Sequence, residues 1–196
     1  MVIEDLNEFL RTVGTARTLR EVQPYLPVEE FDFDLRRLAD AEITTPQRTN
    51  AVAPLKRSAD LLVEADLVRI IGTQFDIVHV QAAAAHLEAH PHSAAHQCIF
   101  LGDSLETVLD DPDMVALFRR IQALTSTDYY RHPGDRSATF SIFDETVVIE
   151  LSDGSGFVPA ILVTDDEAVL AWAEEVFERC RREAEPIVPG AFTAGR

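Results

Sequence analysis

Three apolar runs between residues 137 and 163 are joined by connections that are too short for a parallel crossover. The runs are Ser137–Phe143, Thr146–Leu151 and Phe157–Val163. The connections are the two residues Asp144 and Glu145 and the five residues 152–156. A parallel pair needs a connection of about a dozen residues or more, whereas a hairpin needs only about two to five. The sequence therefore predicts three consecutive antiparallel strands.

Strand and helix patterns alternate in the region before these strands. Strands are predicted for three short segments, at residues 42–45, 68–72 and 96–101. Helices are predicted from Pro54, over 77–89 and from Pro112. Apolar residues recur there at helical spacing, and both prolines suit a first helical position. Such alternation is typical of βα units with parallel strands. We therefore expect an α/β fold with a mixed sheet: βα units in the middle, a three-stranded antiparallel meander and a long C-terminal helix.

The C-terminal helix has the clearest pattern in the chain. Thr164 and Glu167 have the spacing of a capping box, and Pro186 is expected to end the helix. An apolar stripe on one helical face is typical of packing against a core or a dimer partner. The stripe consists of Val169, Trp172, Ala173, Val176, Phe177 and Cys180.

Acidic residues outnumber basic residues by two to one. The chain has 34 Asp and Glu against 17 Lys and Arg, a formal charge of −17, and Lys56 is its only lysine. An acidic surface stays hydrated at high salt, where repulsion between carboxylates is screened. We interpret the composition as that of a halophile's protein; the alternative is an ordinary acidic protein with a bias towards arginine. The halophile interpretation predicts that the fold loses stability when the salt concentration falls.

The sequence predicts a cytoplasmic protein without a membrane segment. No run approaches the ~20 apolar residues that span a bilayer. The first residues, Met1 to Asp5, include no basic region and no apolar stretch of signal-peptide length.

Three stretches carry a resemblance to a known family of regulators. The first comprises Leu19–Leu26 and Asp34–Thr44, and the second is Ala53–Pro54 at the start of a predicted helix. The third comprises Leu162–Ala168, Trp172–Arg179 and Ala184–Pro186. In this combination and order, the sequence resembles winged-helix transcription regulators of halophilic archaea related to a methanogenesis regulatory protein, and more loosely sugar-sensing archaeal regulators. None of the stretches is a catalytic signature.

The resemblance implies the effector half of such a regulator, without catalysis. We expect residues 1–40 to form a helical arm or linker, residues 41–188 an α/β effector domain and residues 189–196 a flexible tail. The implied role is to sense a small-molecule effector, to dimerise, or both. The expected partner is a second copy of the chain or a related regulator. The alternative is a stand-alone interaction module that pairs with full-length regulators and blocks them.

Direct binding of DNA is not expected. Members of the family usually begin with a winged helix-turn-helix, and too few residues precede Leu19 to hold one. A DNA-binding surface also requires clustered basic side chains that neutralise phosphates. Clustered bases such as Arg119–Arg120 and Arg179 with Arg181–Arg182 are few, in a chain whose net charge is −17.

Residues Gly102–Leu105 have the sequence Gly-Asp-Ser-Leu, which matches the signature motif of GDSL esterases. In that family the serine is the nucleophile. A nucleophilic serine needs a base and a group that orients the base. The Asp-x-x-His pair that supplies both in that family is absent, because Asp128 and His132 have a different spacing. An esterase that uses Ser104 is therefore the alternative function. The preferred interpretation is a turn from a strand into a helix, with Asp103 or Ser104 as the N-cap.

Five histidines lie close together in the sequence: His79, His86, His90, His92 and His96. A zinc site would need two of them and a further ligand, but no carboxylate or thiol completes a known ligand pattern. Glycine-rich phosphate-binding motifs are absent from the sequence, and so is the His-x-Lys pair of phospholipase D-like enzymes. We therefore expect neither a metal nor a cofactor.

If the domain binds a small ligand, the carboxyl ends of its parallel strands are the expected place. The six predicted ligand-binding residues follow two of these strands: Gly72, Thr73 and Gln74 after one, and Gly102, Asp103 and Ser104 after the other.

Overall fold

The computed structural model describes residues 12–89, 95–124, 127–154, 157–188 and 190–192. These residues form one mixed sheet of eight strands in the order β1-β7-β6-β5-β2-β3-β4-β8. The strands are β1 (Glu42–Thr44), β2 (Leu67–Gly72), β3 (Ala95–Leu101), β4 (Thr127–His132), β5 (Thr139–Phe143), β6 (Thr146–Leu151), β7 (Ala160–Thr164) and β8 (Glu185–Pro186).

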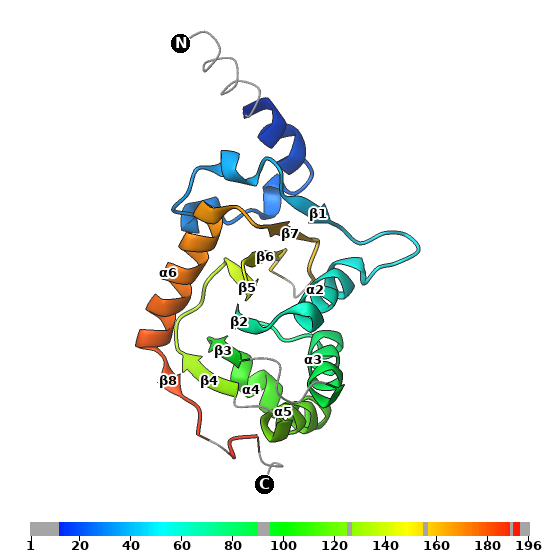
Figure 1. Cartoon of the computed structure of the whole chain (residues 1–196). Coiled ribbons are helices and arrows are strands. Elements are labelled where there is room, and N and C mark those ends of the chain that lie inside the picture. The colour runs from blue at the N-terminus through cyan, green and yellow to red at the C-terminus, as the bar shows by residue number, and fades with distance from the viewer. Residues whose placement is uncertain (1–11, 90–94, 125–126, 155–156, 189, 193–196) are drawn as a thin grey trace.

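Helices cover both faces of this sheet (Figure 1). One face packs against α6 (Glu167–Glu183). The other packs against α2 (Ala53–Glu64), α3 (Ile77–Ala89), α4 (Ser104–Leu109) and α5 (Pro112–Leu124). The protein thus has three layers: helix, sheet and helix. None of the described helices is both long enough and apolar enough to cross a membrane.

The sheet combines parallel βα units with an antiparallel meander. Strands β2, β3 and β4 run parallel, connected by α3 and then by α4 with α5. Strands β5, β6 and β7 pair antiparallel in sequence order, and β5 joins β2 antiparallel. The prediction of an α/β fold with central βα units, a meander and a long last helix is confirmed. The meander follows because its connections allow no other pairing.

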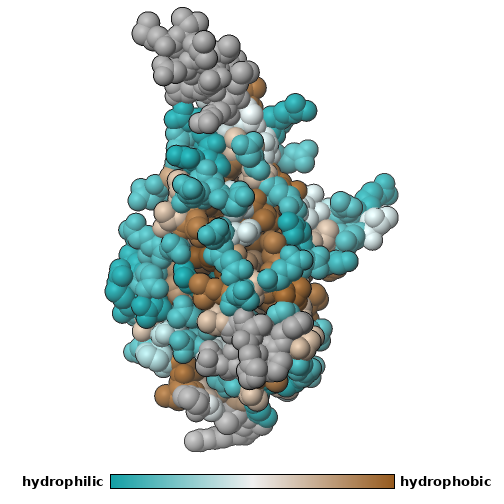
Figure 2. Space-filling view, viewed as in Figure 1, coloured by the Kyte–Doolittle hydropathy of each residue, from teal (hydrophilic) through white to brown (hydrophobic). Residues whose placement is uncertain are grey.

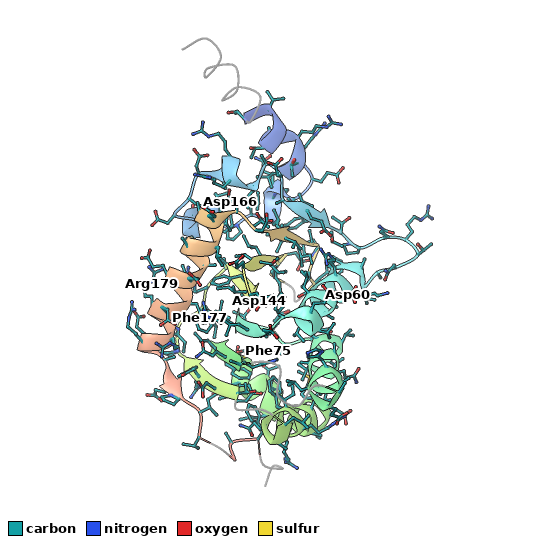
Figure 3. All side chains as sticks on the ribbon, in the orientation of Figure 1. Asp60, Phe75, Asp144, Asp166, Phe177 and Arg179 are labelled. Atoms are coloured by element: carbon teal, nitrogen blue, oxygen red, sulfur yellow. The ribbon has the colours of Figure 1, made fainter. Side chains whose placement is uncertain are left out.

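Side-chain alternation along the strands divides the core in two. On β3, Cys98 and Phe100 face the helices α2 to α5, whereas Ile99 and Leu101 face α6. Phe75, labelled in Figure 3, packs on the α2–α5 side, with its ring centroid 4.4 Å from that of Phe100. Each fully buried side chain of this size contributes about 1.5–3 kcal/mol through removal from water.

Helix α6 begins after Asp166 (Figure 3). The Asp166 carboxylate accepts hydrogen bonds from the amides of Ala168 (2.9 Å) and Val169 (3.3 Å). The predicted capping box of Thr164 and Glu167 is wrong, because the Thr164 hydroxyl instead accepts from the Asp166 amide at 3.2 Å. Asp166 stands directly before the first helical residue, where its carboxylate reaches the free amides and its charge suits the positive helix end.

The segment before β1 packs on the α6 side of the molecule. It consists of a helix at residues 12–19 and the 3-10 turns η1 (Gln23–Tyr25), η2 (Val28–Glu30) and η3 (Leu35–Leu38). Its residues Leu19, Val22 and Leu38 are buried in the α6-side core. We call residues 12–40 the arm. The expected boundary between arm and domain at residue 40 stays a prediction.

Candidate functional site

A cavity of about 480 Å³ lies between the sheet and the helices α2, α3 and α5. Small-molecule sites in proteins have volumes of roughly 300–1,000 Å³ and mostly apolar walls with a few polar groups. The wall of this cavity has that composition. Its apolar residues include Leu62, Ile70, Val80, Ala83, Cys98, Phe118, Ile121 and Phe143.

Polar residues occupy inward-facing positions on four strands of the cavity floor. They are His96 on β3, Thr127 on β4, Ser141 on β5 and Glu150 on β6. Residues two apart on a strand share a face, so Glu150 faces the same side as the buried Val148. Strands that are covered on both faces ordinarily carry apolar residues at such positions. The polar side chains are therefore unusual for packing and are of the kind that orients a ligand.

Several polar atoms of the cavity wall are buried without a hydrogen-bond partner. They are Nε2 of His79 and Nε2 of His96, together with Oγ1 of Thr127 and the hydroxyl of Tyr129, which have no partner beyond their interaction with each other. His96 is only 6% exposed and Tyr129 only 4%. Most buried side-chain polar atoms in proteins have a partner, and leaving one unpaired costs about 1–3 kcal/mol. A bound molecule with matching groups would satisfy these atoms.

Three titratable groups of the cavity are shifted towards their neutral forms. Burial and the nearby charge of Asp76 raise the pKa of Glu150 to about 7. Burial lowers the pKa of His96 to about 4, and it lowers the pKa of His79 as well. Among the described residues of the wall, none is lysine or arginine. The only charged groups that the described wall presents near neutral pH are therefore carboxylates.

The strand register places the polar groups at two ends of the cavity. Glu150 pairs with Thr139 on β5, and two residues further Ser141 pairs with Ile70 on β2. His96 pairs with Val68, which lies two residues before Ile70. Four residues of strand correspond to about 13 Å. The Glu150 end therefore lies near the carboxyl end of β2, and the His96 end lies near the start of β3.

Apolar side chains lie at the rim of the cavity. Val52 is 48% exposed and Phe157 is 52% exposed, although both belong to the cavity wall. Figure 2 shows apolar residues gathered in the middle of one face of the molecule, bordered by polar residues. Such exposed apolar patches often mark binding sites.

The sequence matches a known protein family over residues 52–183: the middle domain of the methanogenesis regulatory protein FilR1. This stretch is more than half of the chain, and it contains every helix and strand that lines the cavity. The chain belongs to this family. The resemblance to regulators related to a methanogenesis regulatory protein is thereby confirmed, and the cavity is a feature of a FilR1-type domain. No match was found among curated protein sequences.

Three solved structures share the fold of the FilR1-type domain. TrmBL2, described as an archaeal chromatin protein with a novel mode of DNA binding, has a TM-score of 0.54 at 13% identity, over 94% of this chain and 66% of that chain. The phospholipase D family member Nuc from Salmonella typhimurium has a TM-score of 0.56 at 9% identity, over 76% of this chain and 99% of that chain. NucT from Helicobacter pylori has a TM-score of 0.58 at 13% identity, with the same coverage. At such identities the likeness concerns the fold alone.

The six predicted ligand-binding residues lie at adjacent strand ends, but only Gln74 lines the cavity. Gly72 ends β2, and its carbonyl oxygen accepts a hydrogen bond from the Ser104 hydroxyl at 3.4 Å, which joins the two loops. Gly102 has a φ of +57°, and the Asp135 side chain fills the space of a Cβ, so a larger residue would be strained there. The assignment of these six residues to a ligand stays a prediction.

Ser104 has the environment of a structural residue. It is 2% exposed, and its hydroxyl makes the bond to Gly72. His132 does not reach it: the His132 Nδ1 accepts from the Gly134 amide at 3.0 Å, and its Nε2 lies 3.5 Å from the Glu183 carboxylate. The strand-to-helix turn expected at this position is present, since α4 begins at Ser104 with Asp103 in the N-cap position.

The clustered histidines separate into two groups. His79 and His96 line the cavity, and the proximity of His86 helps to lower the pKa of His96. His90 and His92 lie outside the described residues. In the part of the chain that the structure describes, no three His, Cys, Asp or Glu side chains are arranged to hold a metal ion.

Sequence reasoning missed most of the cavity residues, although a signal for them exists. Glu150 interrupts the otherwise apolar run Val147–Leu151, and Ser141 interrupts Phe140–Phe143. In strands that are apolar on both faces, a single polar residue occupies a buried position. This signal would have located two of the polar residues, but it could not show that they share one cavity.

Proposed function

We propose that this FilR1-type domain is the regulatory part of a transcription regulator and binds a small-molecule effector in the cavity without converting it. The observation that carries the proposal is a set of buried polar atoms in the cavity wall: Nε2 of His79 and His96 have no partner, and Oγ1 of Thr127 and the Tyr129 hydroxyl have none beyond each other. A ligand would supply the missing hydrogen bonds. Membership of the family supports the regulatory role.

Two enzyme motifs bear on catalysis: one is missing from the sequence, and the other lacks the environment of an active site. The likeness to Nuc and NucT extends to the fold, but the His-x-Lys pair of phospholipase D-like enzymes is missing, because Pro54 stands two residues before the only lysine, Lys56. The serine of the GDSL motif is buried and hydrogen-bonded to Gly72. Neither the phospholipase D-like site nor the GDSL site therefore provides a nucleophile that is paired with a base.

The proposal includes no direct binding of DNA by this chain. Non-specific DNA binding depends on basic side chains that are free to contact phosphates. Most arginines of the described chain already pair with carboxylates of the protein. Those in ion pairs are Arg36, Arg37, Arg57, Arg69, Arg120, Arg131, Arg136, Arg179 and Arg181.

Self-association is the second part of the proposal. Val13, Tyr25 and Val28 of the arm are apolar and between 37% and 49% exposed, as residues of an assembly surface often are. Sedimentation velocity in molar KCl is expected to show a dimer, and co-purification tests pairing with a related regulator. A monomer at all concentrations that does not co-purify with such a regulator contradicts this part.

The binding proposal is tested with three compounds that share one carbon skeleton, a phenyl ring on a four-carbon chain: 4-phenylbutylamine, 4-phenyl-1-butanol and 4-phenylbutanoate. Isothermal titration calorimetry on the full chain is expected to detect binding of at least one of them. Ala83→Phe should abolish this binding, because Ala83 lines the cavity and is 6% exposed. Ala85→Phe is the matched control, because Ala85 lies on the exposed side of α3.

Two outcomes contradict the binding proposal. One is that none of the three compounds binds. The other is that Ala83→Phe, shown to be folded by circular dichroism, binds as the Ala85→Phe control does. The second outcome would place the compounds outside the cavity.

A further inference from the structure

We propose that the cavity accepts an amphiphilic amine, a molecule with an apolar body and a protonated amino group that Asp76, His79 and Glu150 bind near the carboxyl end of β2. This inference rests on the proposed function, since it names the chemical class of the effector.

The first argument is charge. Asp76 and Glu150 both line the cavity, and they are close enough for the charge of Asp76 to oppose the ionisation of Glu150. In the described wall no lysine or arginine balances them. Both side chains are partly buried. Charges that are withdrawn from water are ordinarily paired, and neighbouring carboxylates repel each other. A cation between the two carboxylates would remove both penalties, whereas an anion would add to them.

The second argument is the set of acceptor atoms at this end. Burial lowers the pKa of the His79 ring, while Asp76 and a contact with the Leu55 backbone act in the opposite direction. A neutral imidazole has one acceptor nitrogen, and Nε2 of His79 is buried without a partner. Asp76 uses Oδ1 to accept from the Val78 amide at 2.7 Å, which leaves Oδ2 for a ligand.

These acceptors match the donors of an ammonium group. A primary ammonium has three N–H donors and no acceptor. Asp76, His79 and Glu150 offer one acceptor group each, and Asp76 interacts electrostatically with the other two. A hydroxyl has only one donor and would leave two acceptors unpaired. The site therefore favours an amine over an alcohol of the same shape.

The third argument is the rest of the cavity, which accepts an apolar body. Ile70, Cys98, Phe118 and Phe143 form the wall beyond the carboxylates. At the far end, about 13 Å along the strands, His96 is held neutral by burial. That end is suited to an uncharged polar group and not to a second cation.

The test compares the three phenylbutyl compounds by calorimetry in molar KCl at pH 8. Salt at this concentration screens surface charges far more than buried ones, so nonspecific attraction to the acidic surface is suppressed. The amine is expected to bind at least about tenfold more tightly than the alcohol, and the carboxylate is expected not to bind. Equal or tighter binding of the alcohol or the carboxylate overturns the inference.

Glu150→Gln distinguishes the contribution of the carboxylate from that of the cavity shape. The variant is expected to lose about tenfold or more in affinity for the amine and to keep its affinity for the alcohol. Glu145→Gln is the matched control, because Glu145 is exposed in the turn between β5 and β6. Unchanged amine affinity in Glu150→Gln overturns the inference. The variant removes a partly buried charge, so loss of folding is not expected to interfere.

The pH dependence gives an independent signature. Amine affinity of the unmodified chain is expected to rise between pH 6 and pH 8 as Glu150 ionises, and this rise should be absent in Glu150→Gln. The other titratable groups that face the cavity are Asp76, His79, His96, Cys98 and Tyr129. Burial lowers the pKa of both histidines and raises the pKa of Cys98 and Tyr129, which moves their titration away from this interval.

Failure of this inference is distinguishable from failure of the proposed function. If the alcohol or the carboxylate binds best and Ala83→Phe abolishes that binding, the cavity is an effector site for another class of ligand. If no compound binds, the proposed function fails together with the inference.

Discussion

Glu150 lowers the stability of the empty protein when it ionises. Burial and Asp76 raise its pKa from 4.5 to about 7 in the folded state. The folded protein therefore holds a proton that the unfolded chain releases, so this contribution is complete below about pH 4.5 and is lost as the pH rises through 7. Glu150→Gln is expected to increase the free energy of unfolding at pH 8 by up to about 3 kcal/mol, and the gain should shrink towards pH 5.

Urea unfolding of both proteins from pH 5 to pH 8 measures this effect. His96 acts in the opposite direction, because burial lowers its pKa from 6.5 to about 4, so its contribution is lost as the pH falls. Comparison of the variant with the unmodified chain at each pH cancels the His96 contribution. Glu145→Gln serves as the control, and a gain that does not vary with pH would show that Glu150 is not the titrating group.

Asp144 connects the β5–β6 turn to the start of β2. It has a φ of +53°, and its carboxylate accepts hydrogen bonds from the amides of Leu67 (2.8 Å) and Asp66 (3.2 Å). Asp144→Ala would remove these bonds and place a side chain without local hydrogen bonds in the left-handed region. We expect a loss of about 2 kcal/mol in the free energy of unfolding. Denaturant unfolding measures it, and Glu145→Ala in the same turn should have little effect.

The sequence indicates general places for ligands better than it indicates this particular cavity. The rule that ligands bind at the carboxyl ends of parallel strands led to Gln74, which lines the cavity, and the cavity's acidic end lies near the same strand end. The rule could not predict His96 or Tyr129, because their cavity positions depend on how α3 and α5 pack on the sheet. The hydrophobic pattern of a single segment does not predict how helices pack on a sheet.

At the scale of elements, Glu30 connects the arm to the sheet and to α6. Its carboxylate accepts from the amides of Ser137 (2.6 Å) and Ala138 (3.2 Å) and pairs with Arg136 at 2.7 Å. Its carbonyl accepts from the Trp172 indole at 3.1 Å. The two side chains of the ion pair are largely buried, at 23% and 19% exposure, so the remaining partner would be left unpaired if one were removed.

Glu30→Ala is therefore expected to lower the free energy of unfolding by about 2 kcal/mol or more. Limited proteolysis should cut the arm of this variant faster than the arm of the unmodified chain. Glu29→Ala is the control, because Glu29 is exposed in the same 3-10 turn. If both variants are cut at the unmodified rate, the arm is held by its apolar contacts alone.

Elements that are defined locally could be predicted, and elements that depend on partners could not. The meander was predicted because short turns dictate its pairing, and α6 was predicted because its stripe has helical period. Strand β4 was missed: it reads Thr-Asp-Tyr-Tyr-Arg-His, and only Tyr129 of its residues is fully buried. β4 pairs with β3 over six residues. The sequence of a single segment does not show which strand it pairs with.

At the scale of the whole molecule, the acidic excess is spread over many exposed carboxylates. Most of the described arginines pair with carboxylates. These pairs do not change the net charge of −17, so many carboxylates have no basic partner. Repulsion among the unpaired carboxylates opposes compaction, and salt shortens its range from about 30 Å at 0.01 M to about 3 Å at 1 M. The interpretation of the chain as a protein adapted to high salt depends on this balance and stays a prediction.

The melting temperature is expected to rise by several degrees between millimolar and molar KCl, because salt screens the repulsion in the folded state. Asp110, Glu145 and Asp165 are exposed and take part in none of the described ion pairs. Their combined replacement by the corresponding amides changes the net charge from −17 to −14. This variant should melt higher than the unmodified chain at low salt and depend less on salt. Differential scanning fluorimetry measures both, and a melting temperature independent of salt in the unmodified chain contradicts the halophile interpretation.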